Sequence, residues 1–198
     1  REIVANVRAK GDAALIGYTK QFDRLELTPQ TLRISAEEIS AAYQTASKVT
    51  IEALKFAHGR IRSHHLRQMP KDERYVDDIG VELGSRWTAV ESVGLYVPGG
   101  TASYPSSVLM NAVPAILAGV DRVVMVVPSP DGVLNPLVLV AADIAGVSEI
   151  YRVGGAQAIA ALAHGTESIA PVVKIVGPGN AYVATAKRQV FGTVGIDT

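Results

Sequence analysis

The sequence predicts an α/β protein in which a parallel sheet has helices on its flanks. The second half repeats a pattern of apolar strand, glycine-rich turn and helix. In the clearest instance, residues 172–176 are a β-branched run, a Gly-Pro-Gly turn ends it, and residues 181–190 are good helix formers. A second run, residues 122–127 (RVVMVV), is almost uniformly apolar, as expected of a strand covered on both faces. Repeated units of this kind favour a parallel sheet with right-handed crossovers.

Composition changes near residue 90, which indicates two structural regimes. Residues 1–90 hold 26 of the 38 charged residues but only 5 of the 18 glycines. The remaining residues are rich in glycine and proline, as turns between strands and helices require. We therefore divide the chain into residues 1–92, a helical and extended segment, and residues 93–198, an α/β domain.

Bulk composition limits the partners and the compartment. The 198 residues carry 19 basic and 19 acidic side chains, so the formal net charge is zero, and nothing favours a nucleic acid or an acidic membrane surface. There is no cysteine, which excludes disulfides and thiolate metal sites and suits a reducing compartment. The apolar runs are too short to span a bilayer. We therefore expect a cytoplasmic protein without membrane or nucleic-acid partners.

The first 92 residues begin with helical patterns. Two short helical segments are expected on either side of Gly11, the second capped by Asp12. Ser35 and Glu38 then have the spacing of a capping box. Apolar residues recur behind them at steps of three and four as far as Ile61, which predicts one amphipathic helix of about 25 residues ending before the next proline.

Residues 76–90 change to an extended pattern, with Gly80 and Gly84 as turn or bulge points. Trp87 is expected to be a core residue. The helix before this segment carries histidines at or near its end. Solvated cations at a helix terminus explain them better than a metal site does. These histidines are His58, His64 and His65.

The second regime contains four strand–turn–helix units. The expected strands are residues 93–97, 122–127, 149–153 and 172–176. The helices that follow them are residues 104–117, 135–145, 156–163 and 181–190, and a further strand is expected at residues 194–196.

All the turns that follow parallel strands lie at one edge of the sheet, so their residues should converge. The turns at residues 98–100, 154–157 and 177–180 are rich in glycine, and Gln157 and Asn180 place a side-chain amide where a helix begins. Tyr96 ends the first strand at the same edge. Taken singly, the glycines make tight turns, Asn180 is an N-cap and Gln157 is a helix surface residue. Three such turns at one edge favour a nucleotide or phosphate site.

Catalytic groups are harder to find than binding groups. The sequence contains neither the G-x-G-x-x-G dinucleotide fingerprint after the first strand nor a P-loop. His164 and Glu167 follow a helix, away from the strand edge, so a surface role fits them better than general base chemistry. No paired carboxylates lie at the binding edge. We therefore assign no catalytic residue and no metal ligand to this chain.

Four stretches closely resemble the histidinol dehydrogenase family over essentially the whole chain. They are RAKGDAALIGYTKQFD, GLYVPGGTASYPSSVLMNAVPA, VGGAQAIAALAHGT and KIVGPGNAYVATAKRQVFG. The resemblance implies oxidation of L-histidinol, through the aldehyde, to L-histidine with two NAD⁺ in a zinc-dependent homodimer. It also implies two incomplete Rossmann-like units. Residues 1–92 are then part of one unit, and residues 93–198 form the NAD-binding domain.

Matched residue by residue, the resemblance assigns the NAD contacts to Tyr96, Gln157 and Asn180. The zinc ligands and the Glu-His pair that serves as acid and base would lie downstream of Thr198, so the 198 residues alone are expected to be inactive. Two alternatives remain at this stage. One is another NAD-linked alcohol or aldehyde dehydrogenase, and the other is a non-catalytic nucleotide-binding or assembly module.

Overall fold

A computed structural model describes residues 1–99 and 104–197. Its centre is a five-stranded sheet in the order β5-β4-β3-β6-β7, in which every neighbouring pair is parallel. The strands are β3 (Ser92–Tyr96), β4 (Arg122–Val126), β5 (Glu149–Tyr151), β6 (Lys174–Val176) and β7 (Gly195–Ile196). The predicted parallel α/β sheet is confirmed. The strand order changes direction between β3 and β6, because the chain lays β4 and β5 on one side of β3 and then returns to add β6 on the other.

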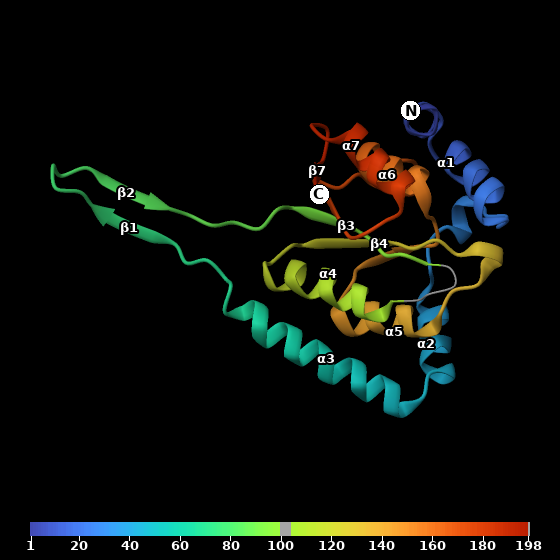
Figure 1. Ribbon diagram of the computed structural model, residues 1–198, viewed down its shortest axis with the longest axis horizontal. Helices are drawn as coiled ribbons and strands as arrows, with labels where there is room; N and C mark the ends of the chain where they lie inside the picture. Colours follow the sequence, from blue (N-terminus) through green and yellow to red (C-terminus); the bar gives the residue numbers. More distant parts are fainter. Residues whose placement is uncertain (100–103, 198) are drawn as a thin grey trace.

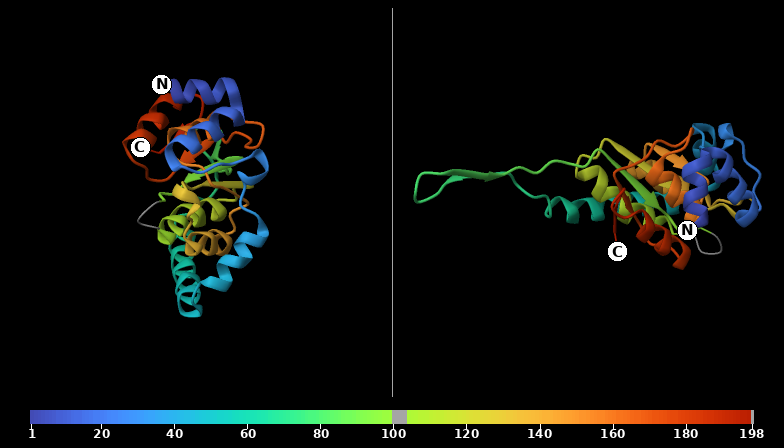
Figure 2. Two further views of the ribbon diagram at one scale, coloured as in Figure 1. Left: turned by 90° about the vertical axis from the view of Figure 1, so that its right-hand side faces the viewer. Right: turned by 90° about the horizontal axis from the view of Figure 1, so that it is seen from above.

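Helices cover both faces of this sheet (Figures 1 and 2). One face carries α4 (Pro105–Leu117) and α5 (Pro136–Ala145), with α2 (Ala36–Thr45) and α3 (Lys48–Leu66) packed against them. The other face carries α6 (Gly155–His164) and α7 (Ala181–Val190), with α1 (Glu2–Asp23) packed against α6. Each face therefore has its own apolar core, and helices of the first 66 residues contribute to both.

Strand β3 contributes side chains to both cores. Successive side chains of a strand point to opposite faces. Leu95 accordingly lies in the core under α4 and α5, and Tyr96 lies in the core under α6. All five residues of β3 are buried, as a central strand covered on both faces requires.

Local sequence signals start and end the helices of the α/β repeats. Asn135 caps α5, since its Oδ1 accepts from the N–H of Leu137 at 2.8 Å. Gly146 ends α5 in the left-handed region at φ 83°. A proline occupies the first position of both α4 and α5, where the missing N–H is harmless. In α4, Val108, Leu109, Ala112 and Val113 are buried, whereas Ile116 is 39% exposed. Short 3₁₀ turns, η1 (Pro29–Thr31) and η2 (Pro130–Gly132), complete the helical elements.

The predicted 25-residue helix is wrong, because the chain makes two helices there, α2 and α3. The capping box at the start of α2 is confirmed, with Glu38 N–H to Ser35 Oγ at 3.3 Å and Ser35 N–H to Glu38 Oε2 at 3.0 Å. Ala46 then turns extended, at φ −76° and ψ 140°, and Ser47 caps α3 by accepting from the N–H of Thr50 at 3.1 Å. The apolar period runs on through the break, so periodicity alone could not reveal it.

The two expected N-terminal segments form one helix, α1, kinked at Gly11 with φ 55° and ψ −133°. The prediction that Asp12 caps the second segment is wrong. Its carboxylate instead accepts from the hydroxyl and the N–H of Ser168, at 2.5 and 3.3 Å. Glu167 accepts from the N–H of Asp12 at 2.7 Å. Both contacts tie α1 to the loop after α6.

A long hairpin projects away from the body (Figure 1). It consists of β1 (Glu73–Val76) and β2 (Glu82–Ser85), which pair antiparallel, with Gly80 in the turn at φ 89°. Every residue of both strands is exposed. The prediction that Trp87 is a core residue is wrong: it is 62% exposed, because the hairpin leaves the body and this residue has little to pack against. In residues 1–99 and 104–197 no helix is long and apolar enough to cross a bilayer.

Candidate functional site

A cavity of about 630 Å³ opens at the carboxyl edge of the sheet. Its lining comes from the end of β3, from the segments that follow β3, β4, β5 and β6, and from both ends of α1. In open parallel sheets, ligands bind where the strand order reverses, which here is between β3 and β6. Tyr96, Gln157 and Asn180 all line this one cavity, so the three expected residues are brought together. Of the expected turn at residues 98–100, Pro98 and Gly99 line the cavity, and Gly100 lies outside the described residues.

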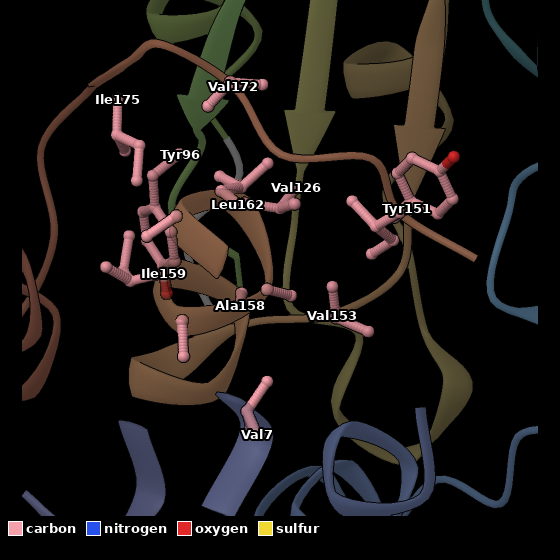
Figure 3. Close-up of a cluster of buried hydrophobic side chains, with 14 of the residues drawn as sticks. Val7, Tyr96, Val126, Tyr151, Val153, Ala158, Ile159, Leu162, Val172 and Ile175 are labelled. Carbon is pink, nitrogen blue, oxygen red and sulfur yellow. The ribbon is translucent and has the colours of Figure 1, made fainter. Parts of the chain in front are cut away.

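Tyr96 joins the cavity to the core. It is 4% exposed, and Figure 3 shows its ring beside Ile159 of α6. Its hydroxyl accepts from the N–H of Gly155 at 3.1 Å, which connects the end of β3 to the start of α6. Burial raises the pKa of the Tyr96 hydroxyl, so the group stays neutral. The ring is packed into the core, and the end of β3 places the hydroxyl at the cavity.

Gln157 is 1% exposed, which overturns the alternative in which it is a helix surface residue. It belongs to the first turn of α6 and lines the cavity. No described residue donates to its buried Oε1. Gly155, at φ 65°, lies so near that an added Cβ would come within 2.7 Å of this oxygen. A buried amide oxygen without a partner is costly unless a ligand supplies the donor.

Asn180 is the N-cap of α7, as one interpretation of the sequence had it. Its Oδ1 accepts from the N–H groups of Tyr182 and Val183, at 3.0 and 3.1 Å. Within the described parts of the chain its amide nitrogen, Nδ2, has no acceptor. The two roles are therefore compatible: the oxygen caps the helix, and the nitrogen is left to donate into the cavity.

The Gly-Pro-Gly turn beside Asn180 is fixed from behind by an ion pair. Lys187 is 6% exposed and donates to the carbonyl of Gly177 at 2.5 Å while pairing with Asp197. Asp197 in turn accepts from the N–H of Gly177 at 2.7 Å. Gly177 has φ 111°, and an added Cβ would lie 2.2 Å from the carbonyl oxygen of Tyr96. Only glycine fits there. Nothing in the local sequence pattern pairs Lys187 with this turn.

Asp23, the last residue of α1, is the residue that sequence reasoning missed. It lines the cavity together with its neighbour Phe22, is 8% exposed, and its Oδ2 has no hydrogen-bond partner among the described residues. Burial raises the pKa of the Asp23 carboxyl, and the charge of Arg24 opposes this rise. Arg24 itself is bound to Asp131 through two hydrogen bonds of 2.6 and 2.5 Å. The only sequence signal is that Asp23 lies at the end of a stretch that resembles the family.

Unpartnered polar atoms gather at this cavity. The described residues contain four buried side-chain polar atoms without a hydrogen-bond partner, and two of them, Asp23 Oδ2 and Gln157 Oε1, belong to lining residues. A third, Ser129 Oγ, lies between Pro128 and Pro130, which also line it. Since buried polar groups are normally satisfied, their clustering here points to a polar ligand.

Backbone donors add a place for an anion. The first N–H groups of a helix lack partners within the helix. In α6 the N–H of Gly155 is taken by Tyr96, but no described residue accepts from those of Ala156 and Gln157. Both residues line the cavity. The site can thus hold a phosphate group at a helix N-terminus while side-chain amides and a carboxylate bind hydroxyl or amide groups nearby.

His164 and Glu167 lie elsewhere, at the far end of α6. Glu167 holds the N–H of Asp12, a structural role. Burial lowers the pKa of His164, assisted by the charge of Arg8. Across the described ranges, no group of three or more His, Cys, Asp or Glu side chains is placed to hold a metal ion.

Comparison with known proteins gives consistent results. The family model for histidinol dehydrogenase matches residues 1–198. Histidinol dehydrogenase from Mesorhizobium japonicum is 74% identical over 197 residues, and that from Brucella abortus (strain 2308) is 71% identical. A crystal structure of histidinol dehydrogenase from Elizabethkingia anophelis superposes over 100% of this chain with a TM-score of 0.95 at 37% identity. The chain spans about half, 46%, of the length of each of these proteins.

Proposed function

This chain belongs to the histidinol dehydrogenase family, and on that premise we propose that it forms the NAD⁺-binding part of an oxidoreductase of histidine biosynthesis. The complete enzyme would oxidise L-histidinol, through L-histidinaldehyde, to L-histidine with two NAD⁺. The observation that carries the proposal is the cavity of about 630 Å³ in which Tyr96, Gln157 and Asn180 meet. Its volume lies within the range of about 300–1,000 Å³ that is usual for small-molecule sites.

The groups at the cavity would each bind or position part of the dinucleotide. The N–H groups of Ala156 and Gln157, for which no described residue is an acceptor, lie at the positive end of α6 and would bind the pyrophosphate. The Gln157 Oε1 would accept from a hydroxyl or amino group of the ligand, and Asn180 Nδ2 would donate to one of its acceptors. Tyr96 keeps the start of α6 in position through Gly155. When bound, NAD⁺ supplies the hydride acceptor.

Zinc does not fit this part of the protein. The residues described here include no cluster of potential ligands, and their part of the cavity lining has a single carboxylate and no histidine or cysteine. We therefore route no step through a metal held by this chain. We propose that the 198 residues bind NAD⁺ but do not oxidise histidinol by themselves.

A homodimer is part of the same proposal. The hairpin of β1 and β2 projects from the body (Figure 1). This arm exposes apolar side chains, among them Val76, Ile79 and Trp87. Single exposed apolar residues are ordinary, but a projecting arm that carries several of them is typical of an interface. We propose that a second copy of the chain covers this arm.

Gln157 offers the sharpest test of the NAD⁺ site. Because no described residue partners its Oε1, Gln157→Met breaks no hydrogen bond seen in the described parts of the chain and should leave the melting temperature unchanged or slightly raised. We expect NAD⁺ affinity, measured by isothermal titration calorimetry, to fall by about fivefold or more, the value of one hydrogen bond. Tyr96→Ala and Asn180→Ala complete the set, each with its melting temperature recorded.

The control is Gln189→Met, the same chemical change at an exposed position of α7 that does not line the cavity. It should bind NAD⁺ as the wild type does. Unchanged affinity in folded Gln157→Met, or equal losses in both methionine variants, would contradict the site. Binding of NAD⁺ together with turnover of several amino alcohols by the complete enzyme would favour a broader alcohol dehydrogenase instead.

A further inference from the structure

Asp23 is the one charged side chain among the described residues that line the cavity. The rest of the described lining is aliphatic, aromatic, glycine, proline or amide, and no Lys, Arg or His contributes to it. The carboxylate is 8% exposed, and its Oδ2 is buried without a hydrogen-bond partner in the described ranges. A charge removed from water in this way is costly unless it is paired or hydrogen-bonded.

The charge of the neighbouring Arg24 offsets only part of this cost, because burial still raises the pKa of Asp23. Arg24 follows Asp23 directly, but its backbone is in the left-handed region at φ 53°, and its guanidinium forms a double hydrogen bond with Asp131. No described residue donates to Asp23 Oδ2, and Gln157 presents only an acceptor there. The hydroxyl of Tyr96 accepts from Gly155 and keeps its own hydrogen, but no hydrogen bond joins it to Asp23 among the described residues. A bound ligand can therefore supply the donors that Asp23 lacks.

The chemistry of a carboxylate identifies the part of the ligand that it meets. An ionised carboxylate only accepts hydrogen bonds, and its two oxygens match two adjacent hydroxyls. It repels a phosphate, and none of the described lining residues is a cation that could compensate. Within a dinucleotide the pyrophosphate would lie at the α6 N-terminus, and the neutral groups with paired hydroxyls are the riboses.

We propose that Asp23 binds the adenosine ribose of the dinucleotide by accepting from its 2′ and 3′ hydroxyls, and that it thereby excludes a cofactor that carries a 2′-phosphate. The inference rests on the proposed NAD⁺ site and adds to it a residue from α1, a helix outside the strand–helix repeats. Asp23 is then a specificity-determining residue, because its carboxylate binds the free 2′ and 3′ hydroxyls and repels a 2′-phosphate.

The test compares NAD⁺ and NADP⁺ binding in the 198-residue chain and in three variants by isothermal titration calorimetry. Asp23→Asn removes the charge and keeps the shape, Asp23→Glu keeps the charge, and Asp78→Asn makes the same charge change on the exposed hairpin. We expect Asp23→Asn to weaken NAD⁺ binding about tenfold, since hydrogen bonds to charged groups are the stronger ones. The preference for NAD⁺ over NADP⁺ should fall by a similar factor.

Asp23→Glu should bind both cofactors less well and keep the preference, and Asp78→Asn should match the wild type. Melting temperatures confirm that each variant is folded. If the wild type binds NAD⁺ and Asp23→Asn retains both its affinity and its preference, the role of Asp23 is overturned while the NAD⁺ site stands. If the wild type does not distinguish NAD⁺ from NADP⁺, the inference fails in the same way. If the wild type binds neither cofactor, the proposed function itself fails.

Discussion

The hydroxyl of Tyr96 accepts a hydrogen bond from the backbone N–H of Gly155 at 3.1 Å, across 59 positions of sequence. The bond joins the end of the central strand β3 to the first turn of α6, the two elements that supply much of the cavity wall. It occupies the first N–H of α6 and leaves the next two without a protein acceptor among the described residues. The bond thus holds the start of α6 in place, and the next two N–H groups still can bind an anion.

Removing this bond should lower stability. Tyr96→Phe keeps the buried ring but leaves the Gly155 N–H without its acceptor, so we expect a loss of about 1–2 kcal/mol in the free energy of unfolding, measured by urea denaturation. Tyr75→Phe, on the exposed hairpin, is the matched control and should change stability by much less. Equal stability of Tyr96→Phe and wild type would show that the bond contributes nothing net.

The two roles of Asn180 can be separated by choosing the substitution. Asn180→Ala removes both the cap and the amide, so the free energy of unfolding should fall by about 1 kcal/mol and NAD⁺ affinity by about fivefold. Asn180→Ser keeps an N-cap oxygen but loses the amide nitrogen. It should therefore retain most of the melting temperature and still lose affinity in calorimetric titration. Full affinity in Asn180→Ser would leave Asn180 with the capping role alone.

Crowding and backbone strain can be told apart at two glycines that share a left-handed backbone. Gly177→Ala adds both, since φ is 111° and the new Cβ would lie 2.2 Å from the carbonyl oxygen of Tyr96. Gly192→Ala, at φ 95°, adds only the strain, because nothing lies within 4 Å of its Cβ. We expect about 1–2 kcal/mol of destabilisation for Gly192→Ala and clearly more for Gly177→Ala in chemical denaturation. Similar losses at the two positions would contradict the close approach of the turn to β3.

Asp23 should make the free protein less stable at neutral pH than it is in acid, relative to a neutral side chain. Its pKa is raised in the folded state by burial, so the fold favours the protonated form. The stability associated with this proton is fully present below the unfolded pKa of about 3.8 and is lost as the pH rises through the raised folded value.

Asp23→Asn should accordingly melt at a higher temperature than wild type at pH 7, and the difference should shrink as the pH falls toward 4. Differential scanning calorimetry of both proteins across this range measures the effect. A difference that does not depend on pH would mean that the carboxyl is not destabilised by burial. The expected gain in stability comes with the expected loss of NAD⁺ affinity, a trade-off typical of binding sites.

The hairpin should govern self-association. We expect the 198-residue chain to sediment as a dimer at micromolar concentration, and Ile79→Lys combined with Trp87→Lys to shift it toward the monomer. Val133→Lys changes an equally exposed apolar residue on the body, next to η2, and is the control. A wild type that is monomeric throughout, or a control that dissociates as readily as the hairpin variant, would exclude the hairpin as the interface.

Most of the α/β repeat could be predicted from the sequence, because its signals are local. Apolar runs, glycine turns and capping residues such as Asn135 and Asn180 determine where strands and helices begin and end within a few residues. The parallel arrangement then follows from the crossover rule. It places Tyr96, Gln157 and Asn180 at one edge of the sheet, because every turn after a parallel strand emerges there.

What the sequence determined by itself was therefore the set of repeats and the edge at which their turns meet. The tertiary structure decided which distant segments complete that edge. It brings Asp23 into the cavity because α1 packs against α6, it sets Lys187 and Asp197 behind the Gly-Pro-Gly turn, and it leaves Trp87 exposed on a projecting hairpin. Each of these depends on how one folded surface packs against another. Such packing joins segments that are far apart in the sequence, and it produces no local sequence pattern that could predict it.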